Sequence, residues 1–239
     1  MRATVSTVVL GSVAAVVANS VPASANTSFG GGLFPTYKQL PVEHAVGLTF
    51  DDGPGPGTEE FLKTLDGLGA KATFFVTGEQ VAETPSRLKE IMAAGHEVGL
   101  HCYRHRNHLR LAPWQVTNDI RRARAVVEDV TGRPIQLYRP PYGVFSLGSW
   151  VESGRQGWER ILWARWGRDW EEQATPRSIA GLIGYPNPGD ILLLHDSDRY
   201  SAPDSWRRTL AALPIIAERL ERTGLVARPV GELLGIGAA

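Results

Sequence analysis

The chain has 239 residues, in which 25 lysines and arginines balance 25 aspartates and glutamates, so its formal net charge at pH 7 is +0. This balance excludes the strongly basic surface typical of nucleic-acid-binding proteins, and the single cysteine excludes an internal disulfide. Hydrophobic residues make up 43% and charged residues 21%, which is typical of a folded domain with a sizeable core. We expect no nucleic-acid partner, and nothing here indicates a stable protein partner.

The first segment has the pattern of a secretory signal. Met1 and Arg2 precede an uncharged stretch with an apolar run over 8–21, and the Ala-Ser-Ala of 23–25 fits a small-x-small cleavage site. We expect residues 1–25 to be a signal peptide and the protein to be secreted or held in the cell envelope. An uncleaved anchor and the ordinary start of a βα unit are the alternatives.

Residues 26–41 contain three consecutive glycines and two prolines without periodicity, which indicates a flexible linker. The folded domain is expected over residues 42–235. Residues 236–239 would then be a short tail.

Within the domain, short apolar runs alternate with helical patterns. Strands are expected at residues 45–50, 71–76, 97–100, 137–138, 161–164 and 190–194, and helices at 61–68, 85–95, 113–130 and 206–222. Because proline interrupts a helix interior, Pro214 is expected to divide the last helix in two. Alternating strands and helices predict parallel pairing, and six or seven such units predict a barrel smaller than the usual eight-fold one.

Two adjacent carboxylates, Asp51 and Asp52, follow the first predicted strand, where Gly53 and Pro54 turn the chain. Loops after the strands are where the active sites of βα barrels lie. Neighbouring strand residues face opposite ways, so we expect the two carboxylates to have different partners. Asp-Asp-Gly is also common in surface turns, so this motif alone leaves its role open.

Two histidines four residues apart, His101 and His105, follow the third predicted strand. In a helical turn they would face one metal ion. Two imidazoles and a carboxylate suit zinc and leave a position open for water. His108 offers a competing pair with His105, and such spacings also occur by chance.

Arg139 and His195 stand at the ends of two further predicted strands. Arg139 opens the Arg-Pro-Pro-Tyr-Gly of 139–143, whose prolines stiffen the loop and fix where the guanidinium points, so that it could orient a carboxylate. His195 shares a strand face with Leu193, so an apolar wall adjoins a titratable group. A surface arginine in a plain turn and a satisfied core histidine are the structural alternatives.

Four fragments occur in a set order along the chain, Thr-Phe-Asp-Asp-Gly-Pro (49–54), His-x-x-x-His (101–105), Arg-Pro-Pro-Tyr-Gly (139–143) and Leu-x-His (193–195). Together they resemble the motif signature of the polysaccharide deacetylases, the family-four carbohydrate esterases with a NodB-homology domain. The resemblance spans about residues 44–235. It implies an α/β fold, a NodB-like distorted (β/α) barrel with about seven parallel strands. It also implies a hydrolase that removes N-acetyl groups from an amino-sugar polymer, peptidoglycan or a chitin-like glycan, and releases acetate.

The resemblance further implies one divalent metal ion, zinc in preference to cobalt or another ion, held by Asp52, His101 and His105. Zinc lowers the pKa of bound water to about 7. Asp51 would be the general base that takes the proton of this water. Arg139 would orient Asp51.

On the leaving-group side, the resemblance assigns His195 as the acid that protonates the departing amine. Asp169 would pair with His195 and raise its pKa. Tyr142, Trp170 and Leu193 would line the pocket for the acetyl methyl group, and the Tyr142 N–H would donate to the oxyanion.

Two departures from the family pattern stand out. Cys102 occupies a position where the family usually has serine or threonine, and we interpret it as a buried structural thiol rather than a fourth ligand. The fourth motif, residues 163–170, has Ala164 and Trp166 where acidic residues are common. This second departure concerns the partner of His195 and the substrate groove.

Three alternative functions remain. The first is an O-acetyl esterase acting on acetylated xylan, which uses the same water activation. The second is a small-molecule amidohydrolase of the same superfamily, and the third is a non-catalytic glycan-binding module. A pure binding module would have no need of the whole set of polar residues that the four fragments contain.

Overall fold

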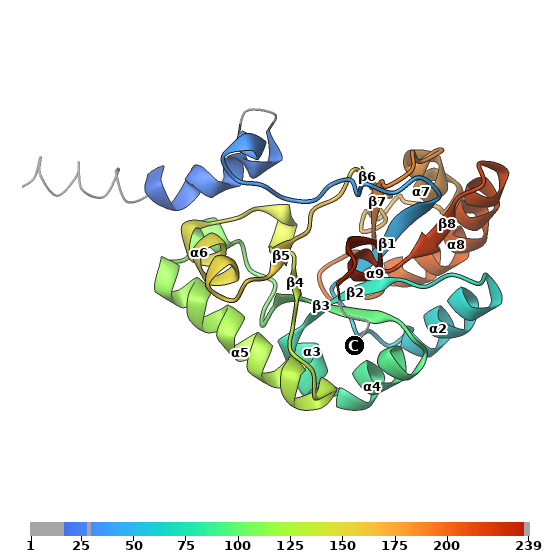
Figure 1. The fold of residues 1–239 in the computed structure, drawn as a ribbon. Coiled ribbons are helices and arrows are strands. Elements are labelled where there is room, and N and C mark those ends of the chain that lie inside the picture. The colour runs from blue at the N-terminus through green and yellow to red at the C-terminus, as the bar shows by residue number, and fades with distance from the viewer. Residues whose placement is uncertain (1–16, 28–29, 237–239) are drawn as a thin grey trace, which may run out of the picture.

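The computed structural model describes residues 17–27 and 30–236 and contains one curled parallel sheet. Seven strands follow one another in the order β5-β4-β3-β2-β1-β7-β6, and β8 pairs with β1. This confirms the prediction of about seven parallel strands in a distorted barrel (Figure 1). The strands are β1 (Ala45–Asp51), β2 (Thr73–Thr77), β3 (Glu97–Cys102), β4 (Leu137–Tyr138), β5 (Glu159–Arg160), β6 (Arg165–Trp166), β7 (Ile191–His195) and β8 (Val226–Arg228).

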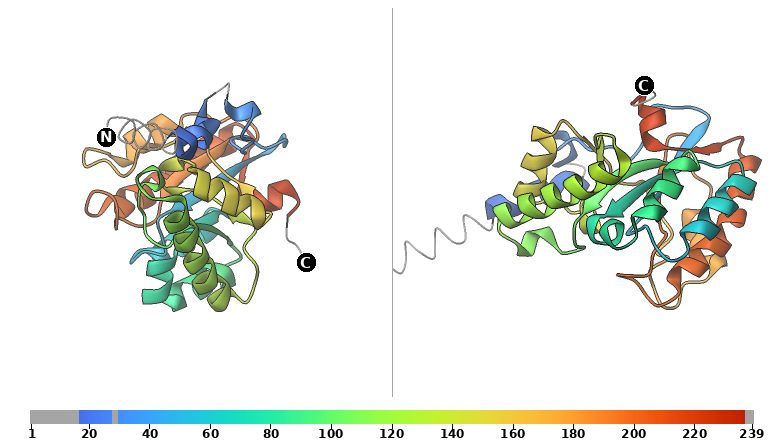
Figure 2. Two further views of the ribbon diagram at one scale, coloured as in Figure 1. Left: turned by 90° about the vertical axis from the view of Figure 1, so that its left-hand side faces the viewer. Right: turned by 90° about the horizontal axis from the view of Figure 1, so that it is seen from below.

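Most of the helices surround the sheet on its outer side, whereas the short last helix lies against β1 (Figure 1). They are α2 (Thr58–Gly67), α3 (Gly78–Glu83), α4 (Pro85–Ala93), α5 (Pro113–Thr131), α6 (Leu147–Arg155), α7 (Pro176–Ile183), α8 (Ser205–Arg222) and α9 (Val230–Leu234). The right-hand view of Figure 2 shows α2 and α8 side by side, and the two helices are in contact. None of the helices in the described part of the chain is long and apolar enough to cross a membrane.

Strand β1 lies in the middle of the sheet and is buried along its whole length. On its outer face Phe50 stacks on Phe74 of β2 at 5.1 Å between ring centroids and meets Phe61 of α2 edge-on at 5.2 Å. Because strand side chains alternate, this packing directs the neighbours of Phe50, Thr49 and Asp51, toward the interior of the barrel. The hydrophobic core thereby places a carboxylate inside the barrel.

The strand predicted over 161–164 is wrong, because the structure has two short strands, β5 and β6, on either side of this stretch. The two strands lie on opposite edges of the sheet, so the chain between them crosses the opening of the barrel. Ile161 therefore makes only an isolated bridge, with Tyr37. The apolar composition of 161–164 reflects burial at this crossing.

Part of the predicted linker is held against the barrel. Tyr37 donates its N–H to Arg160 O at 2.9 Å and accepts from Leu162 N at 2.7 Å, while Leu40 N donates to Gly189 O at 2.8 Å. Residues 37–40 thus run between the two edges of the sheet. Because prolines and glycines flank this segment, the sequence alone did not predict that it pairs with the barrel.

The expected division of the last helix at Pro214 is also wrong, because α8 continues through it. An interior proline costs about 3 kcal/mol through the missing N–H and a steric clash. The buried stripe of α8 extends on both sides of Pro214, so packing of both halves opposes a break. This stripe contains Thr209, Ala212, Leu213, Ile216 and Leu220.

The predicted signal peptide lies outside the described residues over 1–16, as does most of the predicted tail, 237–239. The last part of the predicted signal peptide, residues 17–25, is described. Ala25, the residue before the expected cleavage site, is 2% exposed, and Phe34 packs edge-on against Trp150 of α6 at 4.9 Å. Residues 17–27 and 30–34 therefore lie on the domain beside α6 (Figures 1 and 2).

Candidate active site

The carboxyl ends of the parallel strands bring the predicted polar residues together at one end of the barrel. Parallel strands end at the same edge of a sheet, and ligand sites of βα folds form there. The predicted charged and titratable groups that lie buried or largely buried at this end are Asp51, Asp52, His101, His105, Arg139, Asp169 and His195.

Asp52 lies at the centre of this group. Its Oδ1 is 3.5 Å from His101 Nε2 and 3.6 Å from His105 Nε2, and no atom of the described residues forms a hydrogen bond with it. The backbone of Asp52 has φ 76°, in the left-handed region that is costly for a residue with a Cβ. Gln80 of α3 holds this turn by donating to the Asp52 carbonyl.

His101 is oriented by the backbone. Its Nδ1 is 2.7 Å from the carbonyl oxygen of Arg139, so this nitrogen carries the proton and leaves Nε2 free toward Asp52. Burial lowers the pKa of His101 to about 3, so the imidazole is neutral.

His105 is oriented by aromatic rings instead. It lies between Tyr142, edge-on at 4.5 Å between centroids, and Tyr200, stacked at 4.9 Å. Its Nδ1 is buried and has no hydrogen-bond partner in residues 17–27 and 30–236. Burial, with a smaller contribution from His101, lowers its pKa to about 3.

These three side chains fit a divalent cation. Ligand atoms at about 2.0–2.1 Å from a tetrahedral zinc lie about 3.4 Å apart, close to the observed 3.5 Å and 3.6 Å. One ligand atom from each residue lies within 4.8 Å of the others. Burial raises the pKa of Asp52 to about 7, although the nearby charge of His195 lowers it. A buried carboxylate whose Oδ1 has no hydrogen-bond partner among the described residues, facing two neutral imidazoles, is the donor set that such an ion requires.

Two competing assignments do not join this set. His108 begins a 3-10 turn, η3 (His108–Arg110), and is buried, and the group of potential metal ligands within the described chain excludes it. Cys102 is also fully buried outside that group. Burial raises the pKa of its thiol well above the usual value, which is the property of an unreactive, structural cysteine.

Asp51 faces a different partner, as the alternation along β1 predicts. Its Oδ1 accepts a hydrogen bond from Arg139 Nη1 at 2.6 Å, and the same Nη1 donates to Thr49 Oγ1 at 2.8 Å. Arg139 is 0% exposed, so the two charges compensate each other in a buried ion pair.

Arg139 also donates hydrogen bonds to the backbone between β5 and β6, where strand pairing stops. Its Nη2 donates to Leu162 O at 2.9 Å and its Nε to Ile161 O at 3.4 Å. These carbonyls belong to the crossing between β5 and β6, where ladder hydrogen bonds end. One guanidinium therefore satisfies the backbone of the crossing and orients Asp51, and its planar fork suits both tasks.

His195 is paired with Asp169. His195 Nδ1 lies 2.9 Å from Asp169 Oδ1, and Asp169 Oδ2 accepts from the His195 backbone N–H and from Thr209 Oγ1, each at 2.7 Å. The departures in the fourth motif thus leave the partner of His195 in place. Burial lowers the pKa of His195, but the charge and hydrogen bond of Asp169, with smaller effects of Asp52 and Asp51, outweigh this and raise it to about 9.

The three predicted pocket residues surround this centre at different depths. Leu193 is buried, and it belongs to neither of the two hydrophobic clusters, so it lies on the inner face with His195. Trp170 meets the His195 ring edge-on at 5.4 Å. Tyr142 is exposed with φ 59° and covers His105.

The structure adds residues that the motifs did not reveal. Tyr200 reaches His105 from the loop between β7 and α8, which the polar sequence after His195 marks as longer than a tight turn. Its hydroxyl donates to Glu79 of α3. Asp196 is buried against Gly53, and burial raises its pKa to about 8. No spacing rule connects these residues, because they meet only through neighbouring loops.

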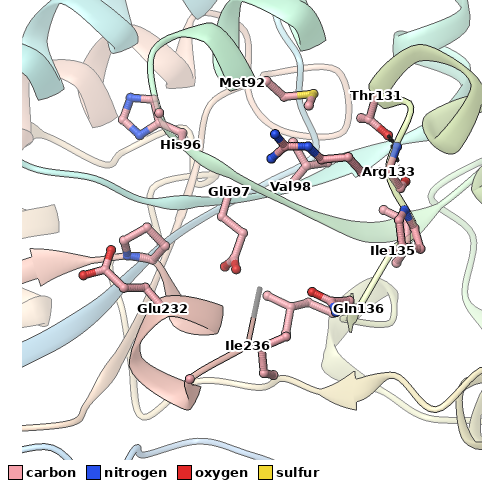
Figure 3. Close-up of a pocket in the computed structure, with 15 residues that line it drawn as sticks. Met92, His96, Glu97, Val98, Thr131, Arg133, Ile135, Gln136, Glu232 and Ile236 are labelled. Carbon is pink, nitrogen blue, oxygen red and sulfur yellow. Dashed lines mark hydrogen bonds between the residues drawn. The ribbon is translucent and has the colours of Figure 1, made fainter. Parts of the chain in front are cut away.

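A large cavity lies at the opposite end of the sheet. It measures about 670 Å³ and is bordered by the starts of β3 and β4, with Glu97, Arg133 and Gln136 among its lining residues (Figure 3). None of the predicted site residues lines it. The candidate active-site residues and this cavity therefore lie at different ends of the barrel.

Comparison with known proteins agrees with the site. The sequence profile of the family described as polysaccharide deacetylase matches residues 38–159. The chain is 30% identical to a chitooligosaccharide deacetylase of Bradyrhizobium sp. (strain ANU 289), over 82% of this chain and 94% of the relative. It is 31% identical to a peptidoglycan-N-acetylglucosamine deacetylase of Bacillus cereus, over 80% of this chain and 89% of that relative.

The fold is likewise similar to that of a solved deacetylase. It superimposes on the Bc1960 peptidoglycan N-acetylglucosamine deacetylase, solved with a substituted N-oxidanyl-benzamide, with a TM-score of 0.78 and 25% identity. The alignment covers 84% of this chain and 94% of that one. The chain belongs to the polysaccharide deacetylase family, and it is a deacetylase of the hydrolase class.

Proposed function

We propose that this protein is a cation-dependent N-deacetylase of an amino-sugar polymer, peptidoglycan or a chitin-like glycan. One observation carries the proposal. The unpartnered Asp52 oxygen faces two neutral imidazoles, while Asp51 and His195, each with its own partner, lie at the same end of the barrel. The named activities of the relatives, on chitooligosaccharides and on peptidoglycan N-acetylglucosamine, support the substrate class.

Asp52, His101 and His105 would hold the cation, for which zinc is the best match to two imidazoles and one carboxylate. A bound divalent ion supplies a lowered water pKa and polarises the acetamide carbonyl. His101 offers Nε2 because the Arg139 carbonyl holds its other nitrogen.

Asp51 takes the proton from the water that attacks the acetamide carbon. Its partner Arg139 holds the carboxylate in place with a charge-assisted hydrogen bond. As the water oxygen bonds to carbon, one proton passes to Asp51 and the carbonyl electrons move to oxygen. The Tyr142 backbone lies in the turn after Arg139, and its N–H would donate to that oxygen.

His195 supplies the second proton. With a pKa raised to about 9, its imidazolium is present at neutral pH, and Asp169 holds Nδ1 so that Nε2 is the proton-donating atom. The carbon–nitrogen bond breaks as nitrogen takes this proton, which releases acetate and a free amine. An alcohol leaves more readily without a proton, so a His195 that is protonated at neutral pH favours N-acetyl over O-acetyl substrates.

We further propose that the protein is exported, because its first 25 residues have the pattern of a signal peptide. Glycans of the cell envelope or surroundings would then be the accessible substrates.

Acetate release tests the function. Purified protein is incubated with peptidoglycan, N-acetylglucosamine oligomers and acetylated xylan, with and without a chelator, and zinc or cobalt is added back. We expect release from one of the two N-acetylated substrates that stops with chelator and returns with metal. Release from acetylated xylan alone would replace the proposal with the esterase alternative, and no chelator-sensitive release from any substrate would refute it.

A further inference from the structure

Three tryptophans within eight residues form a continuous row beside the site. The centroids of Trp163 and Trp166 are 5.9 Å apart, and those of Trp166 and Trp170 are 5.3 Å apart. Trp170 in turn meets the ring of His195 at 5.4 Å. The row therefore begins at the proton donor and leads away from it.

Trp163 and Trp166 differ in how far they are covered. Trp163 is half-buried against Gly143, where an added Cβ would lie 2.4 Å from its ring, and it packs near the Arg139 guanidinium. Trp166 lies on the edge strand β6 and is 44% exposed. Its backbone is fixed by pairing with Leu193 of β7, so an exposed indole is held on a rigid strand rather than on a loop.

An exposed aromatic surface of this kind marks a place where something apolar is received. The charges next to it are already engaged. Arg165 pairs with Asp190 at 2.7 Å, and Arg168 pairs with Glu171. The charged residues nearest to Trp166 in the chain are thus paired, and its exposed flat ring suits a neutral ligand with a flat C–H face.

A pyranose ring has this chemistry, because its ring C–H groups form an apolar face while its hydroxyls remain in water. We propose that Trp166 is a stacking platform for the sugar next to the one whose acetyl group is removed. The proposal rests on the proposed function, since Trp170 and His195 define where the reacting sugar lies. It predicts that the enzyme recognises at least two consecutive sugars and prefers oligomers to a monosaccharide.

The first test measures kcat and KM for N-acetylglucosamine and its oligomers of two to five units. The control is Tyr185→Ala, which removes another exposed aromatic ring, one that follows α7 near the start of β7. An aromatic stacking contact is worth about 0.5–1.5 kcal/mol, so Trp166→Ala should raise KM for the oligomers about two- to tenfold with little change in kcat. The gain in kcat/KM on going from one sugar to two should shrink in Trp166→Ala and persist in Tyr185→Ala.

Two further measurements separate stacking from general damage. Trp166→Phe keeps a ring and should retain most of the chain-length gain, whereas Trp166→Leu keeps apolar area without a ring and should lose it. Thermal unfolding should show that all variants fold as the wild type does. An unchanged chain-length gain in Trp166→Ala would overturn the proposal.

A binding experiment makes the result independent of turnover. In the Asp51→Asn background, a tetramer of N-acetylglucosamine is titrated calorimetrically, with and without Trp166→Ala. Weaker binding in the double variant supports the platform, and equal binding overturns it. If no substrate yields acetate, the proposed function fails on its own evidence, while this titration still decides the platform.

Discussion

The two halves of the site are built on opposite electrostatic principles. In the half formed by Asp52, His101 and His105, one carboxylate oxygen has no partner and both imidazoles are neutral, as far as the described residues go. In the other half each charge has a partner, Asp51 with Arg139 and His195 with Asp169. The first half has capacity for one more positive charge, whereas the second has its charges balanced in advance.

This difference indicates a division of labour. A buried carboxylate oxygen without a hydrogen-bond partner is destabilising, and a bound cation would offset that cost. Groups of opposite charge that pair with each other are held in charge and orientation by that pairing, without a bound cation. Variants in the first half should therefore change cation binding, and variants in the second half should change proton transfer.

The largest effect is expected from removing the carboxylate of the first half. Loss of an outer residue of a metal site costs about 10–100-fold in affinity, so Asp52→Ala should weaken zinc binding by more than about 100-fold and abolish acetate release. Calorimetric titration of the chelator-treated protein measures this. His105→Ala should act in the same way, and His108→Ala should not. The reverse result for the two histidines would show that the ligand pair is misassigned.

Asp51→Asn tests the second half. A general base contributes about 10²–10⁴-fold, so kcat should fall by that factor while zinc affinity stays the same. Asp66→Asn, at an exposed carboxylate of α2, is the matched control and should change neither quantity. Loss of zinc from Asp51→Asn would mean that the two carboxylates have exchanged roles.

The pairing of His195 predicts a pH effect. The imidazolium must be protonated to act as an acid, so the rate should fall as pH rises through the raised pKa of about 9. Asp169→Asn removes the charge that raises this pKa, so the alkaline limb should move to lower pH and kcat should drop at least about tenfold. The pH dependence of kcat in both proteins, with the same metal, measures it. An alkaline limb that does not move would separate His195 from the proton transfer.

The smallest effect concerns how His105 is held. Its ring depends on aromatic contacts, worth about 0.5–1.5 kcal/mol each, so Tyr200→Ala should weaken zinc binding about two- to tenfold. Tyr200→Phe keeps the stacked ring and should bind zinc like the wild type. Equal losses in the two variants would assign the effect to the hydrogen bond with Glu79 instead.

Much of the site could be predicted because its residues follow strands directly. Alternation along β1, with Phe50 packed on the outer face, turns Asp51 inward, and Asp52 follows directly in a turn with a left-handed backbone. The ends of β3 and β7 likewise deliver His101 and His195 to the same edge of the sheet. These are local rules with a period of two, so the sequence alone expresses them.

Other features could not be predicted, because they depend on contacts between distant segments. The stretch 161–164 resembles a strand locally, yet it crosses between the two edges of the sheet. Its unsatisfied carbonyls explain why Arg139 is fully buried. Pro214 stays inside a helix because packing on both sides outweighs its local cost.

The sequence by itself determined which chemical groups stand at the strand ends and that these strands run parallel. Tertiary structure alone decided which groups compensate one another, which carboxylate oxygen is left without a partner, and that the Trp166 ring is exposed. The physical reason is the distance along the chain over which each effect acts. Side-chain alternation acts between neighbours in the chain, whereas burial and charge compensation depend on every element that packs around a group.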